Sequence, residues 1–228
     1  MANPSSLLEL ASGPEKSPQE TLSLYTQFVS NGAVFSPEII TALIDSDNLN
    51  LLHILHQGGV TVDKLKTNYF ANFYGFIRDA ASKNRIRILR FWRETGLTWN
   101  DVENSDALGR VFNFGHLDII RYFVEMGLTV EDIKDSEAIY HATYNGHIDI
   151  IRYLVDEMEM TVEDLIDGEA LETAAANGRL DIIRYFVDEM GMTVRDMKAG
   201  NALGSAAANG RLDVIRYLVD EMGMTVEN

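Results

Sequence analysis

The stretch AAANGRLDIIRYFVDEMGMTV, residues 174–194, decides the fold because it occurs twice. It returns at 206–226, 32 residues further on, with two changes, Ile182 to Val214 and Phe186 to Leu218. Self-similarity at a fixed period of about thirty residues is typical of solenoids, in which each unit buries its apolar face only by stacking on its neighbours. The sequence therefore predicts a repeat protein.

Weaker copies of the same unit lie at 144–162, 114–130, 84–99 and 47–62, and a worn first copy lies at 21–35. The spacings between the residues that open each second helix are 27, 37, 31, 31, 32 and 32, which predicts about seven units: Leu22, Leu49, Ile86, Leu117, Ile148, Leu180, Leu212. The long interval contains an insertion near 67–74, which we expect to form a loop on one face of the array.

One repeat is predicted to consist of two helices and a short helical turn. The first helix ends at Asn177-Gly178, where glycine supplies the left-handed residue that stops a helix. The second helix is apolar on two sides, which indicates packing between two neighbours, with one stripe at Leu180, Ile183, Val187, Met190 and another at Ile182, Phe186. The exit segment carries a threonine with an acidic residue three positions later, as in Thr161 and Asp164, which predicts an N-capped helical turn rather than a β-hairpin.

The polar side of the second helix carries a repeated acid and arginine three residues apart, as in Asp181 and Arg184. Their spacing lets the two side chains pair within one helix. Stacked copies would form charge ladders, which we interpret as a solvated structural face.

Helix-start signals at Ser17-Pro-Gln-Glu20 and Ser36-Pro37 predict ordered structure from about Ser17. We therefore expect a flexible tail over 1–16 and a single repeat domain over 17–228, with irregular repeats at 17–100 and regular acidic repeats at 101–228. The sequence has no cysteine, no run of 18 apolar residues and no basic secretory start. These features predict a cytoplasmic protein, of its own cell or of a host, without a membrane partner.

Charge is distributed unevenly along the chain. Residues 1–100 carry nine acidic and nine Lys or Arg residues, whereas residues 101–228 carry 26 acidic and ten basic residues, which accounts for the whole net charge of -16. An acidic protein repels a nucleic-acid duplex, so the composition argues against direct nucleic-acid binding. It favours a partner protein with a basic surface.

The repeated NGHLDII-YLV core and the G-TV exit, carried in consecutive copies, resemble ankyrin repeats over essentially 20–228. Degenerate repeats of this kind are similar to those of large viruses, amoebal organisms and intracellular bacteria. The family's Thr-Pro-Leu-His start is replaced, for example by Asn201-Ala-Leu-Gly204, and the linking loop is shorter. The resemblance implies an all-α, ankyrin-like solenoid of about seven helix-turn-helix units with β-hairpin fingers reduced or absent. It also implies binding of proteins through a concave face, without catalysis.

Motifs for catalysis or cofactor binding are absent from the sequence. There is no glycine-rich phosphate loop, nucleophile elbow or EF-hand spacing. His116 and His147 stand at the turn between helices, where local hydrogen bonding explains them. We therefore expect no enzyme activity, no cofactor and no metal.

Acid pairs close the second helices, where the helix dipole disfavours negative charge. Their repetition is explained either by recent duplication or by use of an acidic ridge, and further acids at helix starts would broaden that ridge. The candidate partner-binding acids are Asp135, Glu137, Asp156, Glu157, Asp167, Glu169, Glu172, Asp188, Glu189.

Aromatic residues of the insertion lie close in sequence to a basic cluster at 78–93. Such rings serve either as interface anchors or as a small core of their own. The candidate anchors are Tyr69, Phe70, Phe73, Tyr74, Trp99, Tyr144.

The last repeat resembles an internal one, although terminal repeats normally need a polar outer face. An uncovered stripe of Val214, Leu218 and Met222 predicts a homodimer through the C-terminal repeat, another partner or a truncated chain.

Three functions remain open at this point. The first is a non-enzymatic protein-binding module whose acidic C-terminal repeats dock on a basic partner. The second is an inhibitor that mimics nucleic-acid charge and blocks a host nucleic-acid-binding enzyme or defence complex. The third is a self-assembling structural protein whose basic middle contacts the acidic end of another copy.

Overall fold

A computed structural model describes residues 5–30, 36–68 and 70–225 of the chain, and this part contains 19 α-helices and no strand. The chain divides into two compact units, residues 1–111 and 112–228. The division falls inside α9 (Ala107–Phe114), and each unit is described by itself.

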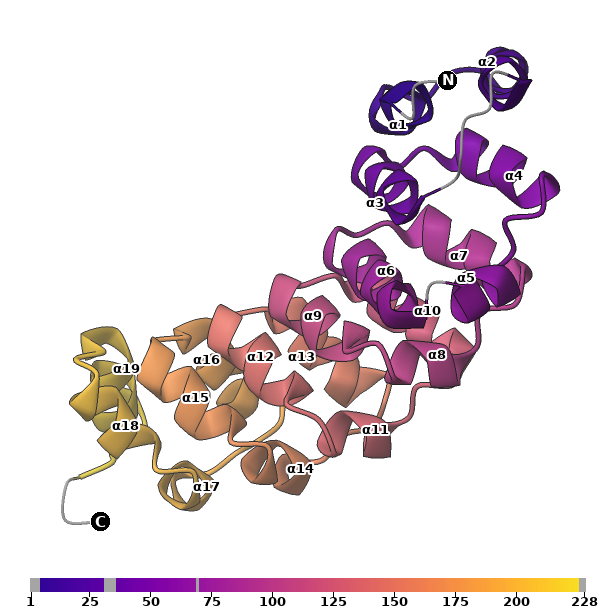
Figure 1. Cartoon of the computed structure of the whole chain (residues 1–228). Coiled ribbons are helices and arrows are strands. Elements are labelled where there is room, and N and C mark those ends of the chain that lie inside the picture. The colour runs from indigo at the N-terminus through magenta and orange to yellow at the C-terminus, as the bar shows by residue number, and fades with distance from the viewer. Residues whose placement is uncertain (1–4, 31–35, 69, 226–228) are drawn as a thin grey trace. The chain divides into compact units, whose positions relative to one another are not determined.

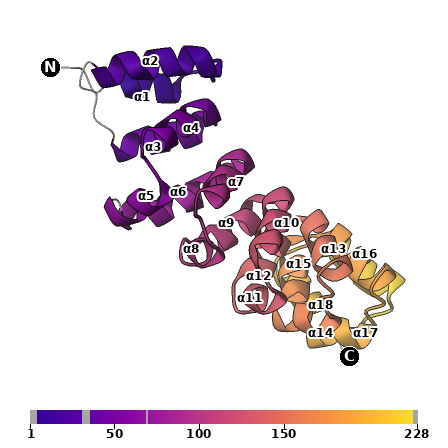
Figure 2. The same cartoon turned by 90° about the vertical axis from the view of Figure 1, so that its right-hand side faces the viewer.

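Unit 1 is built from stacked helix pairs. Its pairs α1/α2, α3/α4 and α6/α7 lie as successive layers, with α1 against α3, α2 against α4 and α3 against α6 (Figure 2). Two short linking helices, α5 and α8, follow the second helices. The bounds are α1 Ser5–Ser12, α2 Pro18–Ser30, α3 Pro37–Ser46, α4 Leu49–Gln57, α5 Val62–Asn68, α6 Phe70–Ser82, α7 Ile86–Glu94 and α8 Trp99–Glu103.

The first helix, α1, lies in the segment for which the sequence predicts a flexible tail. Leu7, Leu10 and Ala11 are buried in this helix, which packs on α3. Asn48 holds it further, because its Nδ2 donates to the Leu10 carbonyl at 3.1 Å. Order therefore begins before Ser17. The sequence analysis missed this helix although Leu7, Leu10 and Ala11 have the i, i+3, i+4 spacing of an apolar helix face, because only eight residues carry the pattern.

The insertion of the third repeat lengthens a helix. α6 has 13 residues, whereas the corresponding first helices α12 and α15 have eight each. The described residues of the segment 67–74, all except residue 69, belong to α5 or α6. The expectation of an inserted loop is therefore wrong for the described residues, where the insertion instead adds helical residues at the start of α6.

Unit 2 repeats one arrangement along its length. The first helices α12, α15 and α18 pack side by side, and α13, α16 and α19 form a second row (Figure 1). The linking helices α11, α14 and α17 lie along the lower edge of the unit in that view. The bounds are α10 Leu117–Met126, α11 Val130–Lys134, α12 Ala138–Asn145, α13 Ile148–Asp156, α14 Val162–Asp167, α15 Ala170–Asn177, α16 Leu180–Asp188, α17 Val194–Ala199, α18 Ala202–Ala208 and α19 Leu212–Arg216, continued by a π-helical turn η1, Tyr217–Glu221.

The turn chemistry predicted from the sequence is confirmed. Gly146 and Gly178 end α12 and α15 with left-handed backbone. Capping boxes begin α8, α11, α14 and α17, and each joins a threonine to the aspartate three residues later, as in Thr161 and Asp164. In each box the threonine side chain accepts a hydrogen bond from the aspartate backbone N–H, and the aspartate side chain accepts one from the threonine backbone N–H. These two hydrogen bonds stabilise linking helices of only five or six residues.

Burial on two sides is confirmed for the second helix α16, although Leu180, Val187 and Met190 of one stripe stay partly exposed. Ile182 and Phe186 on one stripe and Ile183 on the other are completely buried in α16. Each such side chain contributes about 1.5–3 kcal/mol when it is removed from water. Successive helix pairs bury these side chains by packing against one another, so the architecture is an all-α, ankyrin-like repeat solenoid. The described residues contain seven helix pairs.

Candidate functional site

The aromatic residues of the insertion contribute mainly to the interior of unit 1. Phe73 is 1 % exposed, and Lys66 Nζ lies 5.7 Å from its ring centroid. Tyr74 is partly exposed beside Phe73, with 5.6 Å between ring centroids, and Trp99 is also partly exposed. Tyr69 and the side chain of Phe70 lie outside the described residues. Phe73 is therefore a core residue, and the expectation that it serves as an exposed anchor is wrong.

The nine candidate acids are all exposed in unit 2. Four of them end second helices, and the other five stand at the starts of first helices or on the linking helices. The two helices of a pair are antiparallel, so the end of the second helix lies beside the start of the first. Both groups of acids therefore gather at the edge of unit 2 that the linking helices form, here called the acidic edge: Asp135, Glu137, Asp156, Glu157, Asp167, Glu169, Glu172, Asp188, Glu189.

Two further acids, on the linking helices beside the acidic edge, are already paired with a lysine. Lys134 Nζ lies 2.6 Å from Asp164 Oδ1 and 3.5 Å from Glu131 Oε1. The hydrogen bond from Lys134 lowers the pKa of Asp164, and the same contact raises the pKa of Lys134. A basic partner would therefore meet the acids of the acidic edge rather than the capping-box residue Asp164.

Several acids at the ends of second helices connect neighbouring repeats. Arg184 Nη2 lies 2.9 Å from Glu221 Oε1, and the equivalent pair of Arg152 with Glu189 lies at 4.0 Å. The Tyr185 hydroxyl donates to Asp156 Oδ1 at 3.1 Å. These contacts give Asp156 and Glu189 structural roles that the sequence analysis did not consider.

Two tyrosines form an exposed aromatic pair on α12. Tyr140 is 38 % exposed and Tyr144 is 45 % exposed, and their ring centroids lie 5.7 Å apart at an interplanar angle of 31°. They stand one helical turn apart on the same face. Exposed tyrosine is enriched at protein interfaces because it offers a rigid apolar surface with a polar end.

The neighbours of this pair are small or acidic. The positions equivalent to Tyr144 in the next two first helices hold Ala176 and Ala208. These side chains are too small to cover the ring of Tyr144. Glu137 begins α12 and its carboxylate lies 3.6 Å from His141. Glu172, equivalent to Tyr140 in the next repeat, accepts a hydrogen bond from Ser205 at 3.0 Å. We call Glu137, Tyr140, Tyr144, Glu169 and Glu172 the tyrosine face.

Sequence reasoning found Tyr144 but missed Tyr140. The available signal was the departure from the repeat pattern, because Glu172 and Gly204 hold the equivalent position of the later repeats. A large aromatic residue at a position that is otherwise small or charged is not needed for stacking.

The predicted exposed stripe of the last repeat was assigned to the wrong face. Val214 and Leu218 are completely buried, and Met222 is partly exposed. Ile215 and Val219, on the other apolar stripe, are the residues that reach the surface. The error arose because both stripes are apolar, and the sequence does not show which one meets the first helix of its own repeat.

Of the two histidines at the turns, His116 makes a local contact, whereas His147 contacts the preceding repeat, so the expected local hydrogen bond of His147 is wrong. His147 Nε2 lies 3.0 Å from the Asn113 carbonyl oxygen, and His116 stacks on Phe114 with centroids 6.1 Å apart. Within residues 5–30, 36–68 and 70–225, His, Asp and Glu side chains form no group of three or more suited to a metal ion. None of the described helices has the length and apolar character needed to span a membrane.

These helix pairs define a repeat solenoid with surfaces for macromolecular contact. Residues 77–164 match a family model described as ankyrin repeats, in 3 copies. No curated protein and no solved structure matches the chain. The chain therefore carries ankyrin repeats over 77–164, and helix pairs of the same design lie before and after that segment. Ankyrin repeats are typically non-enzymatic modules that bind other proteins.

Proposed function

We propose that this protein is a non-enzymatic binding module and that the tyrosine face of unit 2 contacts a partner protein with a basic surface. The single observation that carries the proposal is the exposed pair Tyr140 and Tyr144, whose rings stand 5.7 Å apart on α12. Rings held side by side on a helix lose little conformational freedom on binding, so they suit a central anchor.

Charge supports a basic partner. Glu137 and Glu169 are exposed at the starts of α12 and α15, and these two helices pack side by side in the row that carries the anchor. Acids around an apolar centre steer a basic surface toward it and disfavour acidic competitors. Screening by salt would slow this association.

The test compares proteins captured from the native cell by the full chain and by two variants. The Tyr140→Ala/Tyr144→Ala variant removes the anchor, and Glu137→Lys/Glu169→Lys reverses charge at acids that make no contact between repeats among the described residues. Quantitative mass spectrometry should show one specific protein depleted about tenfold or more with the first variant, and a smaller, salt-dependent loss with the second.

Leu212→Ala is the matched control, because Leu212 is an exposed apolar residue of unit 2 outside the tyrosine face. It should leave capture unchanged. Equal capture by the wild type and the tyrosine variant, with identical circular dichroism, would refute this face as the binding site.

Mimicry of nucleic acid is the second candidate function, and the exposed acids of the acidic edge favour it. An inhibitor of this type would bind a nucleic-acid-binding enzyme and be displaced by a polynucleotide. Competition by duplex DNA for the captured protein, together with insensitivity to Tyr140→Ala/Tyr144→Ala, would select this function over the tyrosine face.

A further inference from the structure

The tyrosine face of unit 2 meets opposite charges at the two ends of its helices. Glu137 and Glu169 are exposed at the starts of α12 and α15. At the other ends, the guanidinium groups of Arg179 and Arg211 donate to backbone carbonyls in the last turns of α12 and α15, each at 2.7 Å. This order follows the helix macrodipole, which favours acids at a helix start and cations at a helix end.

The two arginine charges are not cancelled by nearby acids. Arg179 and Arg211 donate to backbone carbonyls, and neither makes an ion pair among the described residues. Asp149 and Asp181, which are close in sequence, lie in the first turns of the second helices α13 and α16 and belong to the other helix row. The surface along α12 and α15 is therefore negative at one end and positive at the other.

The two charged ends are about 12 Å apart, because α12 and α15 have eight residues each and a helix rises about 1.5 Å per residue. The rings of Tyr140 and Tyr144 stand on the same face of α12 as Glu137, and they are about 6 Å apart along the helix axis. A complementary segment therefore has an apolar centre and opposite charges about 12 Å apart.

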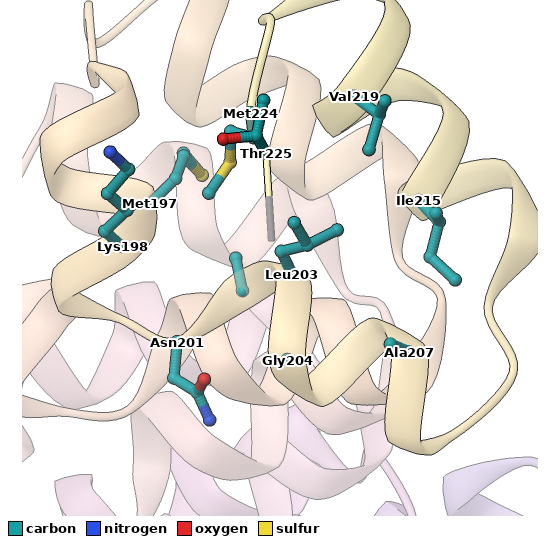
Figure 3. Close-up of a pocket in the computed structure, with 11 residues that line it drawn as sticks. Met197, Lys198, Asn201, Leu203, Gly204, Ala207, Ile215, Val219, Met224 and Thr225 are labelled. Atoms are coloured by element: carbon teal, nitrogen blue, oxygen red, sulfur yellow. The ribbon is translucent and has the colours of Figure 1, made fainter. Parts of the chain in front are cut away.

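The third helix of the row does not continue this pattern. In α18, Asn201 and Gly204 hold the positions of Glu137 and Tyr140. Figure 3 shows both residues, which line a separate pocket beside α17. Because α18 offers neither a charge nor a ring at these positions, the complementary surface is confined to α12 and α15.

An α-helix has the dimensions of the complementary segment. Eight helical residues span about 12 Å, and apolar side chains at i and i+4 stand about 6 Å apart, the same rise as between Tyr140 and Tyr144. A helix also has a macrodipole, which stabilises acids in its first turn and lysine or arginine in its last turn. An extended segment has only a small net dipole and gains no such stabilisation.

We propose that the tyrosine face binds an amphipathic α-helix of its partner protein, and that this helix runs antiparallel to α12 and α15. Lysine or arginine in its last turn then meets Glu137 and Glu169, and acids in its first turn meet Arg179 and Arg211. A parallel helix would need lysine in its first turn and acids in its last turn, against its own dipole. The inference rests on the proposed function and deepens it by assigning the kind and direction of the partner segment.

The probe is a synthetic helix of about 12 residues with glutamates in its first turn, lysines in its last turn and leucines four residues apart on one face. A hydrocarbon staple opposite the leucines keeps it helical, because an unaided helix of this length is marginal. Titration of the full chain into the fluorescently labelled peptide should show saturable anisotropy at a ratio of one to one. The same peptide with a central proline and no staple should bind at least fivefold more weakly.

Charge reversal in the full chain tests the acidic end of the surface. Glu137→Lys/Glu169→Lys should weaken binding at least fivefold. For a second stapled peptide, whose lysines are replaced by glutamine, the loss should be less than twofold because the coupled charges are absent. Glu125→Lys/Asp188→Lys is the matched control, since it changes the net charge equally on exposed residues of the second helices. It should change binding less than twofold.

Photo-crosslinking measures the direction of the bound helix. A benzophenone in the last turn of the peptide should label residues near Glu137 and Glu169, and one in the first turn should label residues near Arg179 and Arg211. Mass spectrometry of the digested complex identifies the labelled residues.

Circular dichroism establishes that each variant is folded before binding is compared. The inference would be overturned by an absence of saturable binding, by cross-links in the reverse order, or by equal losses for the lysine and glutamine peptides. Binding that Tyr140→Ala/Tyr144→Ala abolishes, but that is equal for the stapled and the proline peptides, would overturn the helix and leave the proposed function standing. The proposed function fails separately, when capture of proteins from the cell does not depend on the two tyrosines.

Discussion

Arg184 pairs with Glu221 of the following repeat at 2.9 Å and makes no ion pair with Asp181 of its own helix among the described residues. The sequence spacing allowed the pair within the helix, but the guanidinium extends over the ring of Tyr217, 4.8 Å from the centroid. The contact thus connects two repeats. It also explains a glutamate at a helix end, where the helix dipole alone would disfavour negative charge.

Replacing Arg184 with alanine should lower the stability of unit 2 by about 1 kcal/mol, since both an exposed ion pair and a cation–π contact are lost. Arg216→Ala is the matched control, because Arg216 has the same position in its repeat without these partners among the described residues. Urea denaturation followed by circular dichroism measures the free energy of unfolding of both variants. Equal effects of the two substitutions would contradict a role for the inter-repeat contact.

Removal of the Tyr185 hydroxyl should have a pH-dependent effect. Burial and the hydrogen bond to Asp156 raise the pKa of Tyr185 to about 12. A pKa raised in the folded state means that the neutral phenol contributes stability below the unfolded pKa near 10, and that this contribution is lost as pH rises to about 12.

Tyr185→Phe should therefore cost about 0.5–1.5 kcal/mol at neutral pH through the lost hydrogen bond. The stability of the variant should also fall less steeply than that of the wild type between pH 10 and 12. Thermal melts across this range test the prediction, and parallel pH profiles for the two proteins would refute it.

The ion pair of Lys66 with Asp101 in unit 1 should weaken in acid. Asp101 is buried, and its carboxylate lies 2.7 Å from Lys66 Nζ and 2.8 Å from the Thr98 backbone nitrogen. Burial alone raises the pKa of Asp101, but the hydrogen bonds from Lys66 and Thr98 outweigh it and leave the pKa lowered. A lowered pKa contributes stability above the ordinary aspartate pKa of about 4, and the contribution is lost as pH falls through the folded-state value.

Asp101→Asn should destabilise the protein by about 1–3 kcal/mol at pH 7, because a buried charged hydrogen bond is broken. The difference from the wild type should shrink below about pH 4. Asp106→Asn serves as the control, since Asp106 is exposed and its arginine contact is 3.8 Å long. Chemical denaturation at pH 7 and pH 3 gives the comparison, and a difference independent of pH would exclude the ion pair as its cause.

Close approach of neighbouring repeats should make Gly200 sensitive to substitution. A Cβ atom at this position would lie 2.6 Å from Leu171 Cβ, and one at the equivalent Gly168 would lie 2.8 Å from Ile139 Cδ1. Gly200→Ala should therefore destabilise unit 2 by about 1–3 kcal/mol through overpacking.

Gly75→Ala offers a contrast of opposite sign. Gly75 lies inside α6, and the nearest atom that an added Cβ would meet is Arg78 Nη2 at 3.8 Å. Alanine there should raise stability by about 0.5–1 kcal/mol. Thermal melts of both variants test these two predictions. A Gly200→Ala variant as stable as the wild type would show that the neighbouring repeats can move apart to accommodate the added Cβ atom without loss of stability.

For the acidic edge, the sequence identified the exposed residues but not their contacts with neighbouring repeats. The sequence identified nine acids, and all are exposed. It did not show that Asp156 and Glu189 contact the neighbouring repeat, because those partners are 29 and 37 residues distant along the chain. Charge reversal at these two positions would therefore change stability as well as binding, whereas Glu137 and Glu169 permit a cleaner test.

By itself the sequence determined the repeat, its helix pairs and its capped linking helices. These features follow from local chemistry: a threonine and an aspartate three residues apart, a glycine that ends a helix, and an apolar pattern that recurs every 31 or 32 residues from Ile86 onward. Such signals act within one unit and need no knowledge of its neighbours.

Only the tertiary structure decided which side chains remain available. Both stripes of the last second helix are apolar, and stacking buries Val214 and Leu218 while Ile215 and Val219 reach the surface. In the same way, α1 is ordered by its contact with α3, and Phe73 becomes core while Tyr140 and Tyr144 stay exposed. The physical reason is that exposure depends on what packs against a residue, and in a repeat protein that neighbour comes from another unit of the chain.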